Sequence, residues 1–428
     1  MRGVKSRLSR LLGLLLQIAF GLSALPAQAA QEAWSLSFVG HARTYAMAGR
    51  TTTKQIDAES SDVLELYVAL QRLRPTTEIW WDDFVGLEIA YDLIPMFRTS
   101  TGAASLSDFA VNTTKVLRLV DMDSELVGPG MGKWELLHNL DRLNIRIGHP
   151  GLEVQIGRQA INHGSARMFP STDLFAPFGP GTIDSEFKMG VDAVRFTSAM
   201  GEYHEIEVYL VANELSLDDG VEPFRWMYLA RWRGTFPELF DISLFGGFSY
   251  MRPTFGVDVS TEWMGAAIFG EASARVNLDE GSDTAIRATV GVDYYWEMGL
   301  QTLLELHYSG PGTSVVGDSV TNPSFEHSIG EVSLLSNWYL GTSASYAWQL
   351  YRIGAGAIMN LQDASAMFTL NALYDVSENA VIGIGALLPI GGAPQINQDA
   401  TQGIVGVEFL SEFGMYPILG YLDLRITF

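Results

Sequence analysis

Hydrophobic and polar residues alternate along much of this 428-residue chain, most regularly in a hairpin near its middle. In the first arm, 143–147, leucine and isoleucine alternate with asparagine and arginine, and in the second, 152–156, aliphatic residues alternate with glutamate and glutamine. A β-strand turns successive side chains to opposite faces. The pattern therefore predicts two antiparallel strands with one aliphatic face and one face of charges and amides.

These faces have two possible surroundings. In a soluble protein the aliphatic face packs against a core, whereas in a transmembrane barrel it contacts lipid and the polar face lines a wet lumen. No run after residue 30 approaches 18 uninterrupted apolar residues, although 47% of the chain is hydrophobic and its mean hydropathy is +0.13. A lipid-like average without a helical span is typical of a β-barrel.

Similar strand patterns recur up to the carboxyl end. Besides the two hairpin arms and a strand that begins at residue 191, the predicted strands are 33–46, 63–73, 84–97, 203–211, 224–233, 241–251, 262–276, 286–296, 301–308, 338–348, 352–360, 367–374, 381–390 and 418–428. Bacterial barrels of this kind have an even number of strands. We therefore predict an all-β transmembrane antiparallel barrel of about 18 strands, with 16 as the alternative. The misjudged strand is expected near Lys115, Val257 or Ile404.

Four long polar stretches separate the predicted strands, at 99–132, 162–189, 309–331 and 391–417. The stretch 162–189 is long for a hairpin connection and carries charges of both signs. Loops of that length are usually functional. We predict that this loop folds into the lumen as a constriction, and the alternative is an external cap.

The amino-terminal segment has the pattern of an export signal. Four basic residues precede an apolar run, Leu11 to Leu25, and Ala27-Gln28-Ala29 resembles a signal-peptidase site. The run is shorter than the roughly 20 residues of a membrane-spanning helix, which argues against an uncleaved anchor. We predict a cleaved signal peptide, 1–29, followed by one barrel domain, 30–428, because no linker or change of composition divides the rest.

Charge and cysteine content limit the classes of partner and cofactor that the chain could bind. The chain has a net charge of −22 and the predicted signal peptide is basic, so the mature protein is more acidic still and a nucleic-acid partner is not expected. There is no cysteine, so an exported chain of this size depends on its core or on a closed hydrogen-bonded ring. The acidic turns 217–220 and 277–283 lack the spacing of a calcium loop, and we predict neither a metal site nor a cofactor.

The last eight residues, YLDLRITF, resemble the carboxyl-terminal signal of Gram-negative outer-membrane barrels. This resemblance implies an outer-membrane location, contact with outer-membrane lipid and recognition by the barrel assembly machinery. The residues that carry it are Tyr421, Leu422, Leu424, Ile426 and Phe428.

About 35 central residues resemble the alginate-export and related porin-like families. The matching residues are Gly157, Arg158, Gln159, Gly164, Arg167, Asp173, Leu174, Phe175, Pro177, Gly190, Val191 and Asp192. The resemblance implies a porin-like barrel. The alginate exporter has an electropositive constriction for a polyanion, whereas this chain is acidic, so the likeness implies little about substrate.

The polar face of the central hairpin and the loop after it supply the candidate functional residues. Charged rings inside a barrel select ions or solutes, although such residues can also form a filling salt-bridge network. Strict alternation places Arg158 on the lipid face, unless a bulge at Gly157 turns it or the strand has reached the headgroups. The predicted pore-lining or constriction residues are Arg142, Asn144, Arg146, Glu153, Gln155, Arg158, Gln159, His163, Arg167, Asp173, Asp184, Glu186, Lys188 and Asp192.

The predicted function is passive passage of small hydrophilic solutes or ions. One alternative is export of a polymer such as an exopolysaccharide with periplasmic partners, and another is an enzyme or adhesin on a barrel scaffold. His163, Ser165 and Asp173 are near one another in sequence, but spacing alone does not make a catalytic triad and there is no G-x-S-x-G elbow. We therefore predict no catalytic residue. The sequence leaves the oligomeric state and the direction of transport open.

Overall fold

The computed structural model describes most of the chain after residue 33. The described ranges are 34–55, 61–82, 84–98, 117–118, 134–179, 182–212, 226–277, 284–399 and 404–428. The predicted signal peptide lies outside them, as do most of the 99–132 stretch and the two acidic turns apart from Asn277.

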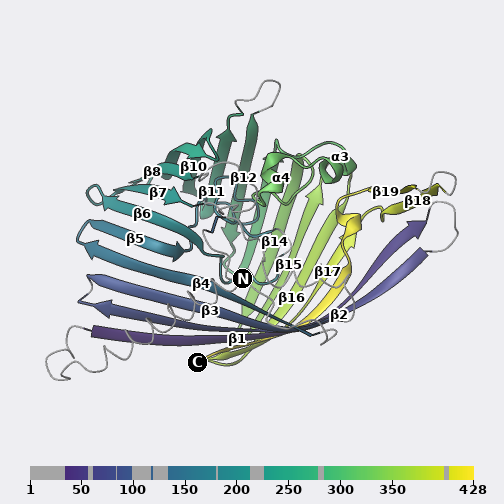
Figure 1. The fold of residues 1–428 in the computed structure, drawn as a ribbon, viewed down its shortest axis with the longest axis horizontal. Coiled ribbons are helices and arrows are strands. Elements are labelled where there is room, and N and C mark those ends of the chain that lie inside the picture. The colour runs from purple at the N-terminus through teal and green to yellow at the C-terminus, as the bar shows by residue number, and fades with distance from the viewer. Residues whose placement is uncertain are drawn as a thin grey trace, which may run out of the picture.

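Eighteen antiparallel strands close into a barrel (Figure 1), which confirms the predicted fold class and the strand number. Strands β1 to β17 pair in chain order, and β20 closes the ring between β17 and β1. The strands of the ring are β1 (Trp34–Gln55), β2 (Ser61–Trp81), β3 (Val85–Arg98), β4 (Trp134–His149), β5 (Leu152–Gln159), β6 (Val191–Ala199), β7 (His204–Val211), β8 (Met227–Phe236), β9 (Phe240–Ser249), β10 (Arg252–Trp263), β11 (Ala266–Arg275), β12 (Ala285–Tyr295), β13 (Leu300–Ser309), β14 (Trp338–Trp348), β15 (Tyr351–Asn360), β16 (Ala366–Ser377), β17 (Ala380–Ile390) and β20 (Ile418–Thr427).

The strand missing from the sequence-based set is β10, which contains Val257. Pro253 and Gly256 lie inside it and resemble turn signals, although its backbone pairs with both neighbours. Two further strands, β18 (Gln395–Asp399) and β19 (Ile404–Glu408), form a hairpin outside the ring, and β18 pairs with the end of β1. Leu117 and Arg118 belong to no strand.

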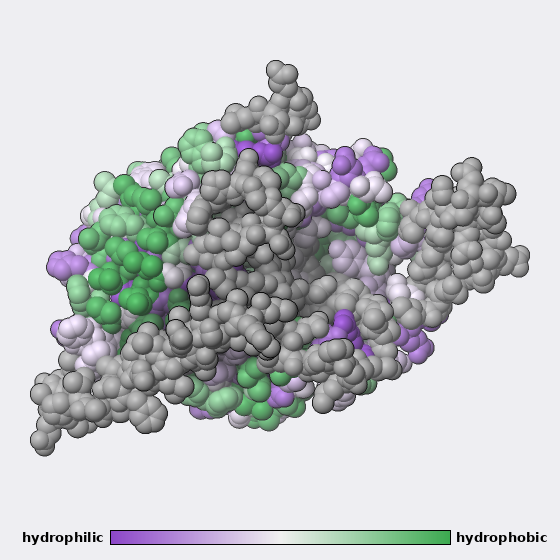
Figure 2. Space-filling view, viewed as in Figure 1, coloured by the Kyte–Doolittle hydropathy of each residue, from purple (hydrophilic) through white to green (hydrophobic). Residues whose placement is uncertain are grey.

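Aliphatic side chains cover the outside of the barrel. Ile156, Val208 and Ile384 are about half exposed on its outer face, and Figure 2 shows hydrophobic side chains gathered over the side formed by β5 to β7. Inward positions carry charged residues instead, among them Arg43 and Glu305. On these strands the aliphatic face therefore points away from the interior, which is the barrel arrangement and not that of a soluble core.

Short turns gather at one end of the barrel and long connections at the other. Exposed tryptophans, including Trp263 and Trp348, lie beside the short turns, as aromatic belts do in membrane barrels. The ring closes at this end through two backbone hydrogen bonds between Gly40 and Phe428, of 2.7 and 2.8 Å. A β-carbon at Gly40 would lie 2.2 Å from the Phe428 ring, so glycine lets this ring pack closely over the seam.

Helices are few and short in the described ranges. The α-helices α3 (Val316–Thr321) and α4 (Phe325–Ser328) lie between β13 and β14, and the 3-10 helix η2 (Phe413–Met415) precedes β20. Within those ranges no helix is long and apolar enough to cross a membrane.

Candidate functional site: a segment across the barrel interior

The connection between β5 and β6 contacts inward-facing residues on both sides of the barrel. We call residues 160–190 the crossing segment; residues 180–181 lie outside the described ranges. Near its start the segment binds Glu271 of β11 and Glu305 of β13, and near its end Asp184 binds Arg43 of β1 and Arg72 of β2. Because β2 and β11 are on opposite sides of the ring, the segment spans the interior.

Two buried carboxylates hold the first half of the segment. The Glu305 carboxylate accepts the backbone N–H groups of Arg167, Met168 and Phe169 at 2.6 to 3.1 Å. The Glu271 carboxylate accepts two further backbone N–H groups, from Ser165 and Thr172, and the Thr172 hydroxyl. Within the described part of the chain, neither carboxylate has a cationic side chain within ion-pair distance. Backbone amide groups of the segment are therefore the main hydrogen-bond donors to both carboxyl groups.

The aromatic ring of Phe169 fixes this half against the barrel wall. It stacks on His307 of β13, with ring centroids 5.0 Å apart, and lies near Tyr339 of β14. A β-carbon at Gly341 would lie 2.6 Å from the Phe169 ring. The glycine therefore lets the segment approach the wall closely.

The middle of the segment is buried beside β7. His163 donates or accepts a hydrogen bond with the Tyr209 hydroxyl at 3.1 Å, and Phe175 packs edge-on against the His163 ring. Burial, assisted by the positive charge of Arg231, lowers the pKa of His163 well below its usual value. The imidazole is therefore neutral at pH 7.

An arginine cluster holds the second half of the segment against β1 to β4. Asp184 accepts from Arg43 at 2.7 Å and from Arg72 at 3.0 Å. Each arginine keeps a second carboxylate partner on the wall, Asp423 and Asp92 respectively. All these side chains are almost fully buried, and in this cluster charged side chains compensate one another.

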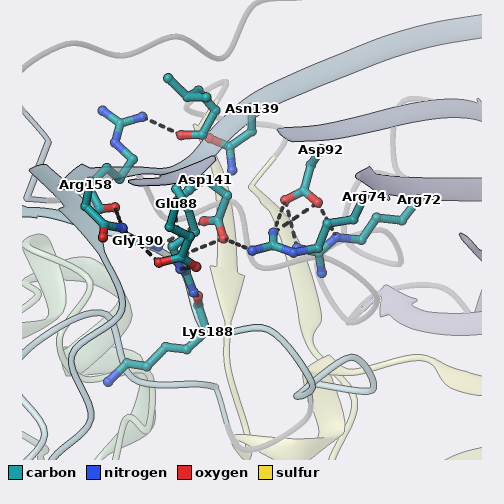
Figure 3. A network of polar contacts seen from close by, with 12 residues as sticks. Arg72, Arg74, Glu88, Asp92, Asn139, Asp141, Arg158, Lys188 and Gly190 are labelled. Carbon is teal, nitrogen blue, oxygen red and sulfur yellow. Dashed lines mark hydrogen bonds and ion pairs between the residues drawn. The ribbon is translucent and has the colours of Figure 1, made fainter. Parts of the chain in front are cut away.

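A β-bulge adds a further carboxylate to this cluster. The register of β3 against β4 shifts between Ala90 and Tyr91, which leaves Asp141 as the extra residue. Its side chain pairs with Arg74 at 2.8 Å (Figure 3). It also pairs with Arg142, at 2.5 Å. Arg142 also donates to the carbonyl oxygen of Lys188, so the bulge helps to fix the returning segment.

The predicted site residues separate into four groups. Arg142, Asn144, Gln155 and Gln159 are buried in hydrogen bonds, whereas Arg146, Glu153, Arg167 and Glu186 keep partly exposed side chains. His163, Asp173, Asp184 and Lys188 belong to the buried parts of the crossing segment.

Arg158 and Asp192 form the fourth group, and their placement differs from the predicted pore lining. They are directly paired in the β5–β6 register, on the same face as the exposed Ile156 and Val194. This is the outer face, and Arg158 donates to Asp192 at 2.8 Å. Gly157 adopts a positive φ of 120°, yet the pairing continues through it, so no bulge turns Arg158 inward.

The three residues considered for a catalytic triad are bound to separate partners. His163 contacts Tyr209, and Ser165 donates to Asp258 at 2.5 Å. Asp173 pairs with Lys188. In the described ranges, no group of three or more histidine, aspartate or glutamate side chains is arranged to hold a metal ion.

The carboxylates of the far wall were not among the predicted site residues. Glu271 and Glu305 lie in predicted strands, at inward positions, but nothing in their local pattern indicates that a distant loop binds them. The arginines of β1 and β2 were missed for the same reason. Alternation gave no signal for Arg72, because its inward face on β2 also carries Val68 and Leu70.

Solved structures share the architecture. No family model and no curated protein matches the sequence. The crystal structure of Acinetobacter baumannii OccAB4 has 7% sequence identity and a TM-score of 0.50, over 92% of this chain and 97% of that one. That of Pseudomonas aeruginosa OccD3 (OpdP) has 9% identity and a TM-score of 0.50, over 92% and 91%. At these identities the likeness shows the fold, a closed 18-stranded antiparallel barrel, and the alginate-export resemblance stays a prediction.

Proposed function

We propose that the protein is an outer-membrane channel for passive passage of small hydrophilic solutes or ions, along a lumen narrowed by the crossing segment. The observation that carries this proposal is the closed ring with aliphatic side chains outside and charged side chains inside. In lipid, a closed barrel satisfies its backbone groups without an open edge. A polar interior in such a barrel is suited to hydrated solutes.

The exposure of the inward charges indicates which of them a solute would meet. Arg146 keeps 35% of its side chain exposed and pairs loosely with Glu88 at 3.5 Å. Arg167 is 63% exposed, and Glu186 is 43% exposed. By contrast, Arg142 is buried. We therefore assign contact with solutes to the exposed group and a structural role to Arg142.

Export and assembly follow from the chain ends. The predicted signal peptide would direct the chain across the inner membrane. Leu422, Leu424 and Ile426 are exposed on the outer face of β20, where barrel assembly machinery and later outer-membrane lipid would contact them. The proposal includes no cofactor and no covalent chemistry, and the separate partners of His163, Ser165 and Asp173 support that.

Planar-bilayer recordings of the refolded mature protein test this function. We expect steady conductance, and we expect Arg146→Ala to shift the reversal potential in a salt gradient toward cation selectivity. The matched control is Arg50→Ala, which removes an exposed arginine of β1 that pairs with the outward-facing Ile418. Absence of conductance from folded, heat-modifiable protein would contradict the proposal. It would instead favour a polymer exporter that needs periplasmic partners.

A further inference from the structure

We propose that Glu271 and Glu305 act together as a latch that holds the crossing segment in its closing position inside the barrel. They are positioning residues, since they act through the segment and need not touch a solute. The geometry stands by itself, while the consequence for transport rests on the proposed channel function.

The latch is concentrated on eight consecutive residues, 165–172. Within this stretch the two carboxylates accept the backbone N–H groups of Ser165, Arg167, Met168, Phe169 and Thr172. The wall adds two hydroxyl contacts, from Ser273 and Thr289 to the carbonyl oxygens of Ser171 and Phe169. The wall side chains thus bind the backbone of this stretch, and its conformation depends on them.

Among the described residues, the charged groups around the latch form no ion pair with its two carboxylates. Beside Glu271 lie Asp258 of β10, which accepts from Ser165, and Arg275 of β11, which pairs with Glu326 and with Glu331. Near Glu305 lie His307 of the same strand and Asp293 of β12. The nearest ion-pair partner of the Arg167 guanidinium is Asp293, at 3.7 Å. The amides of the segment are therefore the main compensation for the two carboxylates.

The latched stretch completes an apolar closure of the interior. Phe169 belongs to one buried cluster with inward residues of distant strands, among them Tyr45 of β1, Val68 of β2 and Ile358 of β15. These side chains are at most 2% exposed, although they point into the barrel. Without the covering loops they would face the lumen. Moving Phe169 away from the wall would therefore open this part of the interior.

Replacement of both carboxylates by amides removes the latch at nearly constant volume. In E271Q/E305Q each amide group offers one carbonyl acceptor and adds N–H donors that face the donors of the segment. The segment should leave the wall more often, while the barrel, whose strand pairing does not involve these side chains, stays folded. The single variants E271Q and E305Q should show intermediate effects.

Cysteine labelling measures that release directly. The chain has no cysteine, so Ser171→Cys introduces one unique thiol at a position that is 1% exposed. We expect E271Q/E305Q to accelerate its labelling by a small maleimide roughly tenfold or more, as expected for a local opening made easier. Glu262→Gln is the control, because Glu262 is an exposed residue of β10 for which the described part of the structure shows no contact with the segment.

Conductance of the same proteins separates this inference from the proposed function. A severalfold higher single-channel conductance in E271Q/E305Q, with faster labelling, supports both. Faster labelling without conductance in any variant keeps the latch and overturns the channel. Labelling in folded E271Q/E305Q that equals the Glu262→Gln control overturns the latch, whatever the conductance.

Discussion

The two halves of the crossing segment are held by different chemistries. At the β1–β4 side, Asp184 is bound by the side chains of Arg43 and Arg72, so charge is compensated by charge. At the β11–β13 side, Glu271 and Glu305 are bound by backbone amides. Removal of one partner at the arginine side leaves a buried charge without full compensation. Removal of a carboxylate at the glutamate side leaves neutral backbone N–H groups without an acceptor. The arginine side is therefore expected to be the firmer anchor.

The largest expected effect is the loss of Asp184. We expect Asp184→Ala to lower the free energy of unfolding by about 3 kcal/mol, the lower end for a broken buried pair. The lower end applies because Arg43 keeps Asp423 and Arg72 keeps Asp92. Urea unfolding of both proteins in lipid vesicles measures this difference in the free energy of unfolding. A smaller loss than that caused by Glu305→Ala would reverse the ranking of the two anchors.

A smaller effect is expected from Glu305→Ala. Three backbone N–H groups lose their acceptor, and water that enters the barrel can bind some of them. We therefore expect the free energy of unfolding to fall by about 2 kcal/mol. The same unfolding assay applies. Glu305→Gln should be milder than Glu305→Ala, and equal losses in the two variants would show that the acceptor is not what matters.

Substitution of Gly341, which lies in close contact with the segment, should lower the free energy of unfolding less than loss of Glu305. A methyl group at this position would meet Phe169 at 2.6 Å and the sulfur of Met168 at 2.8 Å. Because both contacts are with side chains that can shift, we expect Gly341→Ala to cost about 1 kcal/mol. Labelling of Ser171→Cys should also accelerate. Unchanged stability and labelling would mean that Phe169 is not seated against β14.

The smallest expected effect is a dependence on pH through His163. Its pKa is lowered in the folded state, so the unfolded chain binds the proton more readily, and stability falls as pH drops below the ordinary histidine pKa of 6.5. His163→Gln should reduce this slope between pH 7.5 and 5.5, as measured by unfolding at each pH. An identical slope in both proteins would show that His163 is not held neutral.

The sequence was sufficient to predict the ring of strands but not the contacts that the crossing segment makes inside it. Alternation decides which face of each strand points outward, and it placed Ile156 and Leu422 correctly on the outer face. Pro253 and Gly256 hid β10, because turn residues inside a strand remove the local signal. The crossing segment contacts residues of β10 and β1 that are 93 and 141 positions away in sequence, in the Ser165–Asp258 and Arg43–Asp184 pairs, and local patterns do not report such contacts.

The chemistry of the two anchors explains why one half of the segment was partly readable. Asp184 and Lys188 are charged and stood out as candidates, so the arginine side could be anticipated in kind. The other half binds through its backbone, which no side chain reveals. Arg158 was included in the predicted pore lining although strict alternation placed it on the lipid face, and its register agrees with the alternation.

The most direct test is the conductance of a variant in which residues 162–189 are replaced by a short glycine-serine turn. If the crossing segment narrows a solute channel, this variant should conduct severalfold more than the full chain and lose the effect of Arg146→Ala on selectivity. Equal conductance from both folded proteins would contradict the account, because the segment would then not control passage through the barrel.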